Sequence, residues 1–521
     1  MDFSTIDFIV FIGYCLLIIG IGLWVSRDKG GHEKNSEDYF LASKSLPWWA
    51  IGSSLIASNI SAEQFIGMSG SGYAIGFGIA SYELMAAITL IVVAKFFLPI
   101  FIREKIFTMP QFLEHRYDSR VRTSMAIFWI FLFVFVNLTS ILYLGALALQ
   151  TIMGVDLMYG IIGLALFSGL YSIYGGLKAV AWTDVIQVIF LIGGGLITTY
   201  LAVNAVGGDT GFFAGASALL EKAPEKFDLI FDSNQEAYSY LPGISVLVGG
   251  MWIANLSYWG CNQYIIQRAL AAKNIEEGQR GILFAGFLKV VLPLIVVIPG
   301  IAAFALQADI AKPDEAYPWL LSTFVPTGIK GLAFAALIAA VVSSLSSMIN
   351  SISTIFTLDI YKPFFNKNSS EGNLVKVGRL TSAVALLIAV LVGPQLANLD
   401  QAFQFIQKYS GYVSPGVVVI FIFGLFWKKS TANAALAVAV ASIPFSILVD
   451  SVLFPEMPFI DQMGVVFLIL SAMMVAITYI EGYSHSKGFT FGMELFKTSS
   501  VFNMVSILLF TFVAAIYALW W

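Results

Sequence analysis

Apolar runs of about 20 residues follow one another along almost the whole chain. In helical conformation, each run is long enough to cross the ~30 Å hydrocarbon core of a bilayer. We therefore expect an all-α polytopic membrane protein with fourteen transmembrane helices. The expected spans cover residues 6–25, 47–74, 78–99, 123–152, 158–175, 183–205, 243–267, 279–304, 329–357, 377–396, 402–427, 431–451, 461–481 and 501–520.

The second span departs most from a simple apolar helix. Its centre reads SNISAEQ (58–64), and three glycines follow within the next eight residues. A carboxylate at the centre of a lipid-exposed helix costs at least ~2.5 kcal/mol, so this segment must face protein or water. We expect an unwound helix whose bare backbone lines a site for a solute and a cation. The simpler alternative is a polar patch that holds helices together.

The seventh span is interrupted in a similar way, with the sequence GGMWIANLSYWGCNQ at 249–263. The second and seventh spans begin two blocks of five spans, and an odd number of spans inverts one block relative to the other. Paired interrupted helices in two such halves indicate a transporter site at the bilayer midplane. We expect an added helix and cytoplasmic loop (1–45), a first repeat (46–205), an extracellular loop (206–242), a second repeat (243–429) and three C-terminal helices (430–521).

The basic residues predict the orientation of the chain. Of the 28 Lys and Arg, 21 fall in alternate loops beginning after the first span, and Arg268 after the seventh span is one of them. The opposite loops hold only four. Because positive charge is retained in the cytoplasm, we expect a cell-membrane protein (an inner-membrane protein in a bacterium) with both termini on the extracellular or periplasmic side. The remaining three basic residues lie within spans: Lys95, Lys289 and Lys408.

Composition agrees with this class and argues against several others. The chain is 58% hydrophobic and only 12% charged, which is typical of a polytopic membrane protein. No basic tract indicates nucleic-acid binding, and the two cysteines form no disulfide framework. No pair of Cys, His or carboxylate residues in the spans has the spacing of a transition-metal site. A G-x-S-G pattern at 67–70 fits the nucleophile of an intramembrane protease, but no span contains the histidine base this chemistry needs.

Six sequence blocks carry a resemblance that covers nearly the whole chain: GLWVSRDK, SLPWWAIGSSLIASNISAEQFIGMSGSG, FVNLTSILYLG, SIYGGLKAVAWTDVIQV, NQYIIQR and VSSLSSMINS. With these blocks the chain resembles the sodium/solute symporter family. The resemblance implies a leucine-transporter-type 5+5 inverted repeat with broken helices, one helix before it and further helices after it. It also implies a transporter and not an enzyme, with Na⁺ as the coupled ion.

The resemblance further implies a sodium site between the break in the second span and the ninth span. Such an all-oxygen cage suits a hard cation, although the two serines alone would equally suit a small-residue packing face. Asp184 matches a family residue thought to assist sodium release; its simpler interpretation is an interfacial carboxylate near a helix start. The matching ligands are the backbone carbonyls of Ala57, Ile60 and Ala340 and the hydroxyls of Ser343 and Ser344.

For the solute, the resemblance implies a hexose held by polar side chains from several spans. Carboxylates, amides and an ammonium suit sugar hydroxyls, which both donate and accept hydrogen bonds. Alternatively, the two charged members form a buried ion pair with partners elsewhere in the fold, and the two amides of the second repeat bond to the backbone. The matching positions are Gln64, Glu83, Asn255, Lys289 and Gln407.

Aromatic and apolar residues match two gates of the family. Tyr258 matches an inner gate that stacks on the sugar ring and is held by the amide of Asn59. Met68, Tyr82 and Phe403 match an outer hydrophobic lid. Considered without the family, Met68 and Phe403 are ordinary core residues.

Together these expectations describe a symporter that imports galactose or glucose by alternating access, driven by the Na⁺ gradient. Its implied partners are the sugar, Na⁺ and the lipid bilayer, with no nucleic acid and no obligate protein partner. Within the family, myo-inositol, sialic acid, proline and iodide are alternative solutes, and a passive sodium channel or sensor is an alternative function. Ala86 stands where galactose-transporting members have a sugar-contacting serine, and Cys261 replaces a family aromatic, so the preferred hexose stays open.

Overall fold

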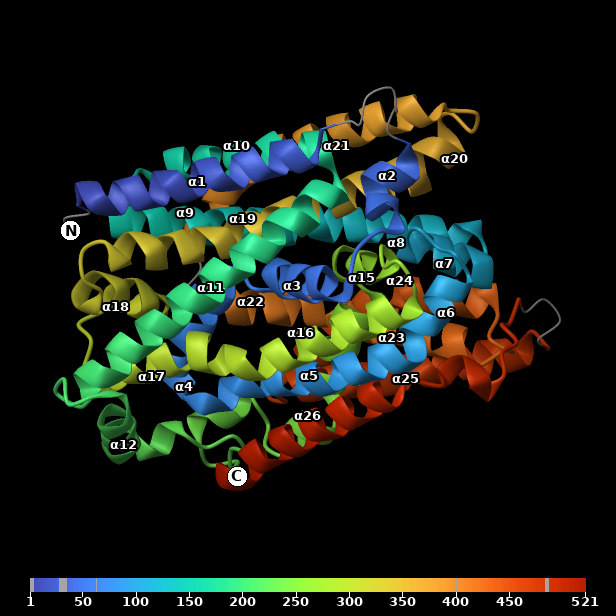
Figure 1. Ribbon diagram of the computed structural model, residues 1–521. Helices are drawn as coiled ribbons and strands as arrows, with labels where there is room; N and C mark the ends of the chain where they lie inside the picture. The colour runs from blue at the N-terminus through green and yellow to red at the C-terminus, as the bar shows by residue number, and fades with distance from the viewer. Residues whose placement is uncertain (1–3, 28–34, 62, 399–401, 483–486) are drawn as a thin grey trace.

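The computed structural model describes residues 4–27, 35–61, 63–398, 402–482 and 487–521 (Figure 1). Within these ranges the regular elements are helices, apart from one isolated parallel bridge between Leu46 and Ala272. Twelve of the described helices are long and apolar enough to cross a membrane, which makes the chain a multi-pass helical membrane protein.

The first half of the chain contains α1 (Thr5–Val25), α2 (Ser36–Leu41), α3 (Trp48–Asn59), α4 (Ser69–Ile75), α5 (Ser81–Val92), α6 (Leu98–Arg103), α7 (Met109–Arg116), α8 (Ser119–Leu132), α9 (Thr139–Met153), α10 (Leu157–Gly175), α11 (Leu177–Val206) and α12 (Phe212–Lys222). The second half contains α13 (Ser245–Val248), α14 (Gly250–Leu256), α15 (Gln263–Leu270), α16 (Ile275–Val296), α17 (Ile298–Ala305), α18 (Ala316–Phe324), α19 (Ile329–Ile355), α20 (Lys362–Phe364), α21 (Glu371–Val392), α22 (Ala402–Gly411), α23 (Ser414–Phe426), α24 (Ala432–Leu448), α25 (Phe459–Ile480) and α26 (Ser500–Leu519). Between several of them the helix widens into π segments, at Glu63–Met68, Val93–Phe97, Phe133–Leu138, Ser257–Cys261, Phe356–Tyr361 and Val449–Leu453.

The two spans predicted to be interrupted are broken. Helix α3 ends at Asn59, where Ile60 takes an extended conformation (ψ 105°), and the chain resumes helical structure at Glu63. In the seventh span the break falls at Asn262 (φ −86°, ψ 126°), whose side chain caps α15 by accepting a hydrogen bond from the Tyr264 backbone nitrogen. The breaks also explain why the predicted count of fourteen is not confirmed: α3 and the pieces α13, α14 and α15 are each too short to count as a spanning helix.

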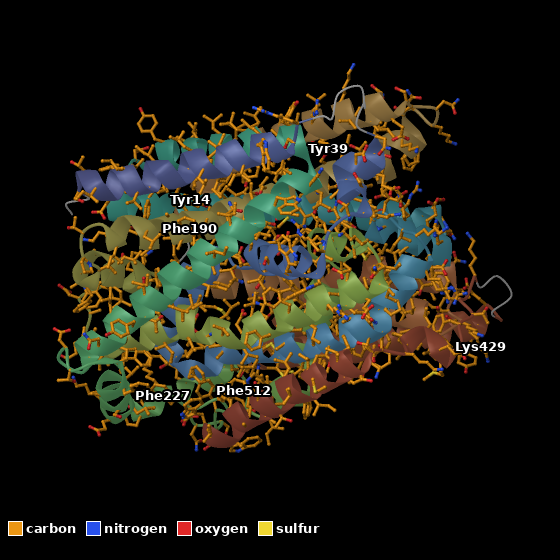
Figure 2. All side chains as sticks on the ribbon, in the orientation of Figure 1. Tyr14, Tyr39, Phe190, Phe227, Lys429 and Phe512 are labelled. Carbon is orange, nitrogen blue, oxygen red and sulfur yellow. The ribbon has the colours of Figure 1, made fainter. Side chains whose placement is uncertain are left out.

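Helix α3 lies at the centre of the bundle (Figure 1), where it packs against α11, α16 and α19. Helix α1 lies on one side of this core, against α10, α11 and α19, and α26 lies on the opposite side, along α5 and α16. The rings of Tyr14 on α1 and Phe190 on α11 are 5.0 Å apart and join the first helix to the bundle (Figure 2). The outer helices expose large apolar side chains, among them Ile9, Leu166 and Phe510, as lipid contact requires.

Close approach between α17 and α4 depends on Gly300. A Cβ atom at this position would lie 1.9 Å from the Ser69 carbonyl oxygen and 2.8 Å from the Tyr73 backbone nitrogen, and backbone cannot yield cheaply. We expect Gly300→Ala to destabilise the protein by ~2 kcal/mol, as overpacking commonly does. Thermal unfolding in detergent would measure this, with Gly372→Ala as the control, because no atom lies within 4 Å of a Cβ built there. Equal melting temperatures for the two variants would contradict the prediction.

Candidate functional site

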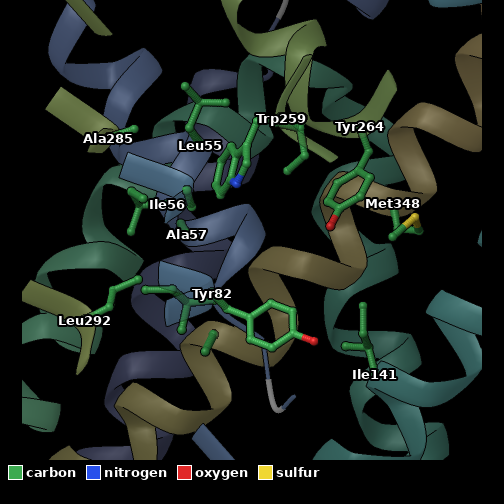
Figure 3. Close-up of a cluster of buried hydrophobic side chains, with 14 of the residues drawn as sticks. Leu55, Ile56, Ala57, Tyr82, Ile141, Trp259, Tyr264, Ala285, Leu292 and Met348 are labelled. Atoms are coloured by element: carbon green, nitrogen blue, oxygen red, sulfur yellow. The ribbon is translucent and has the colours of Figure 1, made fainter. Parts of the chain in front are cut away.

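A cavity of about 110 Å³ lies beside both helix breaks. Polar residues of the two breaks line it, together with residues from α5, α8, α16, α22 and α25. Figure 3 shows Leu55, Ile56 and Ala57 of α3 beside Trp259, with the rings of Tyr82 and Tyr264 around the same central region. All five side chains that the sequence predicts to hold a solute line this one cavity: Gln64, Glu83, Asn255, Lys289 and Gln407.

A buried ion pair crosses the wall of the cavity. The Lys289 ammonium on α16 donates to a carboxylate oxygen of Glu83 on α5 and to the side-chain oxygen of Asn59 at the end of α3. Its nitrogen also lies 4.9 Å from the centre of the Trp259 ring, at cation–π distance. The alternative of a buried pair is therefore realised, with each charge as the partner of the other. Both side chains nevertheless line the cavity, so the other Glu83 oxygen and the remaining ammonium protons of Lys289 can form hydrogen bonds with a hydroxylated solute.

Tyr258 is held by partners from both halves of the chain. The Asn59 side-chain nitrogen donates to the Tyr258 hydroxyl at 2.9 Å, and the hydroxyls of Tyr258 and Tyr264 are hydrogen-bonded to each other. Asn59 thus joins Lys289 to Tyr258 through the two ends of one amide. The structure brings together the pair that the resemblance assigns to an inner gate.

In two of the predicted solute-binding amides, Gln64 and Asn255, one polar atom of the side chain is hydrogen-bonded to the protein itself. The Gln64 side-chain oxygen accepts from the backbone nitrogen of Ser61 (2.9 Å) and from its hydroxyl (3.0 Å), which closes the loop at the break. The Asn255 side-chain nitrogen donates to the Met251 carbonyl at 3.0 Å. The Gln64 nitrogen and the Asn255 oxygen make no hydrogen bond to the part of the chain that is described, and Gln407 makes none with its side chain.

The residues predicted to form an outer lid fall in different places. Tyr82 lines the cavity. Met68 lies fully buried in the π segment after the first break and is not part of the cavity lining. The side chain of Phe403 lies outside the described residues.

The residues predicted to bind sodium lie at the contact between α3, α11 and α19. The Ser344 hydroxyl donates to the backbone carbonyls of Ser58 (2.9 Å) and Ile60 (3.3 Å), which α3 leaves free where it ends. The Ser343 hydroxyl donates to Asp184 at 2.6 Å. Ala57 and Ala340, whose carbonyls complete the predicted ligand set, are both fully buried in α3 and α19.

Asp184 is not an interfacial carboxylate, and that simpler interpretation is wrong. It lies in α11 with no exposed surface. Besides the Ser343 bond, its carboxylate accepts hydrogen bonds from the hydroxyls of Ser54 (2.5 Å) and Ser58 (3.5 Å), both on α3. Asp184 therefore connects the broken helix to α19 directly behind the predicted sodium ligands.

The prediction for Arg268 is also wrong. Instead of lying in a cytoplasmic loop, it is fully buried in α15, which continues three residues beyond the predicted span end at 267. Its Nε donates to the Ser54 hydroxyl at 3.3 Å, and another guanidinium nitrogen donates to the Tyr264 carbonyl. No Gly or Pro occurs between Gln263 and Glu277, and that absence of a helix stop is the signal for a longer helix.

Several residues that line the cavity were not among the predicted site residues, including Glu63, Asn137, Trp259 and Tyr264. Trp259 and Tyr264 flank the second break, so their proximity to the predicted gate Tyr258 is the signal that identifies them. Asn137 stands in the apolar run FVFVNL of the fourth span, where an isolated amide indicates a polar interior.

A family model described as "Sodium:solute symporter family" matches residues 39–441. The chain is 53% identical to the sodium/glucose cotransporter of Vibrio parahaemolyticus over 538 residues, covering 99% of this chain and 98% of the relative. It is 36% identical to sodium/myo-inositol cotransporter 2 of Mus musculus, with 82% and 67% covered. The solved structure of a Na⁺-coupled sialic acid symporter, in a substrate-bound outward-open state, superposes with a TM-score of 0.82 at 26% identity, covering 94% of this chain and 100% of that one.

Proposed function

The chain belongs to the sodium:solute symporter family, and from this premise we propose that it couples inward movement of a hexose, glucose or galactose, to the Na⁺ gradient. The observation that carries the proposal is the convergence of the five polar side chains on one cavity beside two broken helices. A cluster of carboxylate, ammonium and amide groups matches the paired donors and acceptors of a sugar ring. The relative from Vibrio parahaemolyticus, named as a sodium/glucose cotransporter, supports the same solute class.

Coupling follows from the contact between α3 and α19. In the proposal, Na⁺ binds to the carbonyls of Ala57, Ile60 and Ala340 and the hydroxyls of Ser343 and Ser344, and so holds the broken helix against α19. This favours the state in which the sugar-binding side chains are assembled, and the differential affinity of the two states couples the fluxes. At −100 mV each Na⁺ contributes ~2.3 kcal/mol in addition to its concentration gradient.

Loss of Na⁺ to the cytoplasm would then release the solute. In the proposal, Asp184 assists the departing ion because its carboxylate already receives the Ser343 hydroxyl. Once the α3 contact loosens, Asn59 no longer fixes Tyr258, and the inner gate opens. Tyr82 acts on the opposite side of the solute, with Phe403 and Met68 as further members of the lid.

The same proposal includes the topology. The segments 46–75 and 243–270 each cross the bilayer in broken form, which gives fourteen spans arranged as inverted repeats at 46–205 and 243–429. The start of α1 and the end of α26 lie toward the same end of the bundle (Figure 1), and the backbone nitrogen of Leu229, in the loop 206–242, donates to the Trp520 carbonyl. With the basic residues retained inside, these ends lie outside the cytoplasm. No obligate protein partner is part of the proposal.

A cyclic polyol is the second candidate solute, favoured by the 36% identity to a sodium/myo-inositol cotransporter. The cavity offers inositol the same hydrogen-bonding groups, so its chemistry alone does not separate a ring of carbons from a pyranose.

Uptake into proteoliposomes tests the proposal. We expect labelled glucose or galactose to enter in a saturable manner when Na⁺ is present outside and not when K⁺ replaces it. Equal uptake in both salts would contradict symport, and flux that does not saturate with sugar would indicate a channel. Competition by galactose, glucose and myo-inositol ranks the solutes, and preferential inhibition by myo-inositol would replace the hexose with the polyol.

A further inference from the structure

Helix α22 brings Gln407 to the solute cavity, but no bond of the Gln407 side chain fixes it there. This side chain lines the cavity and makes no hydrogen bond within the described part of the chain. Its place in the cavity therefore depends on how α22 itself is held. Several contacts at the end of α22 come from α24 and from the π segment that follows α24, which lie outside the two repeats proposed at 46–205 and 243–429.

The interruption between α22 and α23 is bridged by two hydroxyls of α24. The Tyr412 carbonyl, which lies in this interruption, accepts hydrogen bonds from the hydroxyls of Ser446 (2.9 Å) and Ser442 (3.1 Å). The Ser442 oxygen also accepts a hydrogen bond from the Gly416 backbone nitrogen at 3.2 Å. A side chain inserted in this way between backbone partners is a known cause of a bend in a helix. Helix α24 therefore fixes the junction at which α22 ends.

A carboxylate within the same span continues this row of contacts. Asp450 stands four residues beyond Ser446, in the π segment after α24, so the two side chains share one face. One Asp450 oxygen lies 3.0 Å from the Lys408 ammonium nitrogen, and the other accepts a hydrogen bond from the Tyr412 hydroxyl at 2.6 Å. Lys408 directly follows Gln407, so the carboxylate holds α22 one residue away from the side chain that lines the cavity.

Neutralisation of charge alone does not account for this arrangement. A carboxylate within a span needs a partner of opposite charge, and Lys408 provides one. Asp450 nevertheless uses its second oxygen for Tyr412, one helical turn beyond Lys408 on the same face. Two bonds to residues one turn apart fix the rotation of α22 as well as its position. Charge-assisted hydrogen bonds are stronger than neutral ones, which suits them to this task.

We propose that Asp450 is a positioning residue of the transport site, which holds α22 so that the Gln407 amide meets the solute. The inference rests on the proposed function, and it adds to the solute site a residue that does not itself line the cavity. Without the carboxylate, α22 can rotate or shift, and the amide loses its alignment with the solute hydroxyls.

Substitutions at both ends of the contact test the proposal. In Na⁺-driven uptake into proteoliposomes, Asp450→Asn should raise the KM about tenfold for the solute that the wild type transports best among labelled glucose, galactose and myo-inositol. Tyr412→Phe removes one of the two bonds and should raise it about threefold. Because KM does not depend on the fraction of protein that is active, misfolding would lower the maximal rate alone. A KM within twofold of the wild type in Asp450→Asn would overturn the inference.

A neutral double variant separates positioning from neutralisation. Lys408→Met combined with Asp450→Leu leaves no unpaired charge in the span, and its KM should stay about tenfold raised because α22 is still not held. A wild-type KM in this variant would show that the pair only neutralises charge and would overturn the inference. The Na⁺ concentration for half-maximal uptake at saturating solute should be unchanged in Asp450→Asn. An equal tenfold shift there would mean that the contact biases the whole transport cycle, which also overturns it.

The matched control is Glu276→Gln, which breaks the exposed ion pair between Glu276 and Arg280 at the start of α16 and should keep the wild-type KM. The wild type itself distinguishes the two levels of the argument. Absence of Na⁺-driven uptake of all three solutes would overturn the proposed function and this inference with it. Na⁺-driven uptake by the wild type together with an unaltered KM in Asp450→Asn would overturn this inference alone.

Discussion

Replacement of Glu83 by glutamine is expected to reduce Na⁺-driven solute uptake at least a hundredfold. Its partner Lys289 has only 1% of its side chain exposed, so the variant leaves an ammonium ion inside the protein with the Asn59 oxygen and the Trp259 ring as its remaining partners. Removing one member of a buried ion pair costs about 3–5 kcal/mol, which corresponds to two to four orders of magnitude in an equilibrium constant. The same change removes an acceptor from the proposed sugar site. Initial rates of labelled hexose uptake measure the loss.

A double variant separates the structural part of this effect from the functional part. Glu83→Gln combined with Lys289→Met removes both charges and should restore the melting temperature that Glu83→Gln lowers, because no unpaired charge is left. Uptake should stay as low as in the single variant, because the cavity then offers the solute neither the Glu83 carboxylate nor the Lys289 ammonium. Restoration of uptake together with stability would show that the pair serves the fold alone, and a Glu83→Gln rate within threefold of the wild type would refute the prediction entirely.

The broken helices were predictable from sequence because polar groups in lipid are costly. The run SNISAEQ within a span, and a matching run two hundred residues later, have no favourable place on a lipid-facing helix. The structure places both breaks within these runs, at Ile60 and Asn262. The structure does not confirm the predicted number of spans in the same way, because a break divides a span into helices that are individually too short, and only twelve of the described helices are long enough to cross a membrane.

The partners of the site residues could not be predicted, because they come from distant parts of the chain. Glu83 and Lys289 are 206 residues apart and each stands among apolar neighbours, so neither local sequence names the other. The bond between Asn59 and Tyr258 spans 199 residues. Glu63 was visible in the sequence as part of the polar run. Only the structure shows that it lines the cavity and that its Oε1 atom has no hydrogen-bond partner among the described residues, while Gln64 bonds back to Ser61.

In the proposed sodium site, Asp184 would orient the hydroxyl of one ligand, Ser343, which donates to its carboxylate. Because the Ser343 hydroxyl donates its proton to the carboxylate at 2.6 Å, its lone pairs are free for a cation on the other side. Ser54 also donates to Asp184, and Arg268 donates to the Ser54 oxygen at 3.3 Å, which fixes the direction of that hydroxyl in turn. The carboxylate thus brings a negative charge to within about 5 Å of an ion bound to Ser343, at an effective dielectric constant of about 20, where two unit charges interact by ~3 kcal/mol.

We therefore expect Asp184→Asn to raise the Na⁺ concentration for half-maximal uptake by ten- to a hundredfold, the upper value being the full ~3 kcal/mol of attraction. Saturating Na⁺ should recover most of the maximal rate, because the side chains that line the solute cavity are unchanged. The matched control is Asp309→Asn, in an exposed loop position, which should leave the Na⁺ dependence unaltered. A lowered maximal rate with unchanged Na⁺ dependence would mean that Asp184 only joins α3 to α19. If Asp184 lies beside the bound ion, the variant should need more Na⁺ for half-maximal uptake and should regain its rate at high Na⁺.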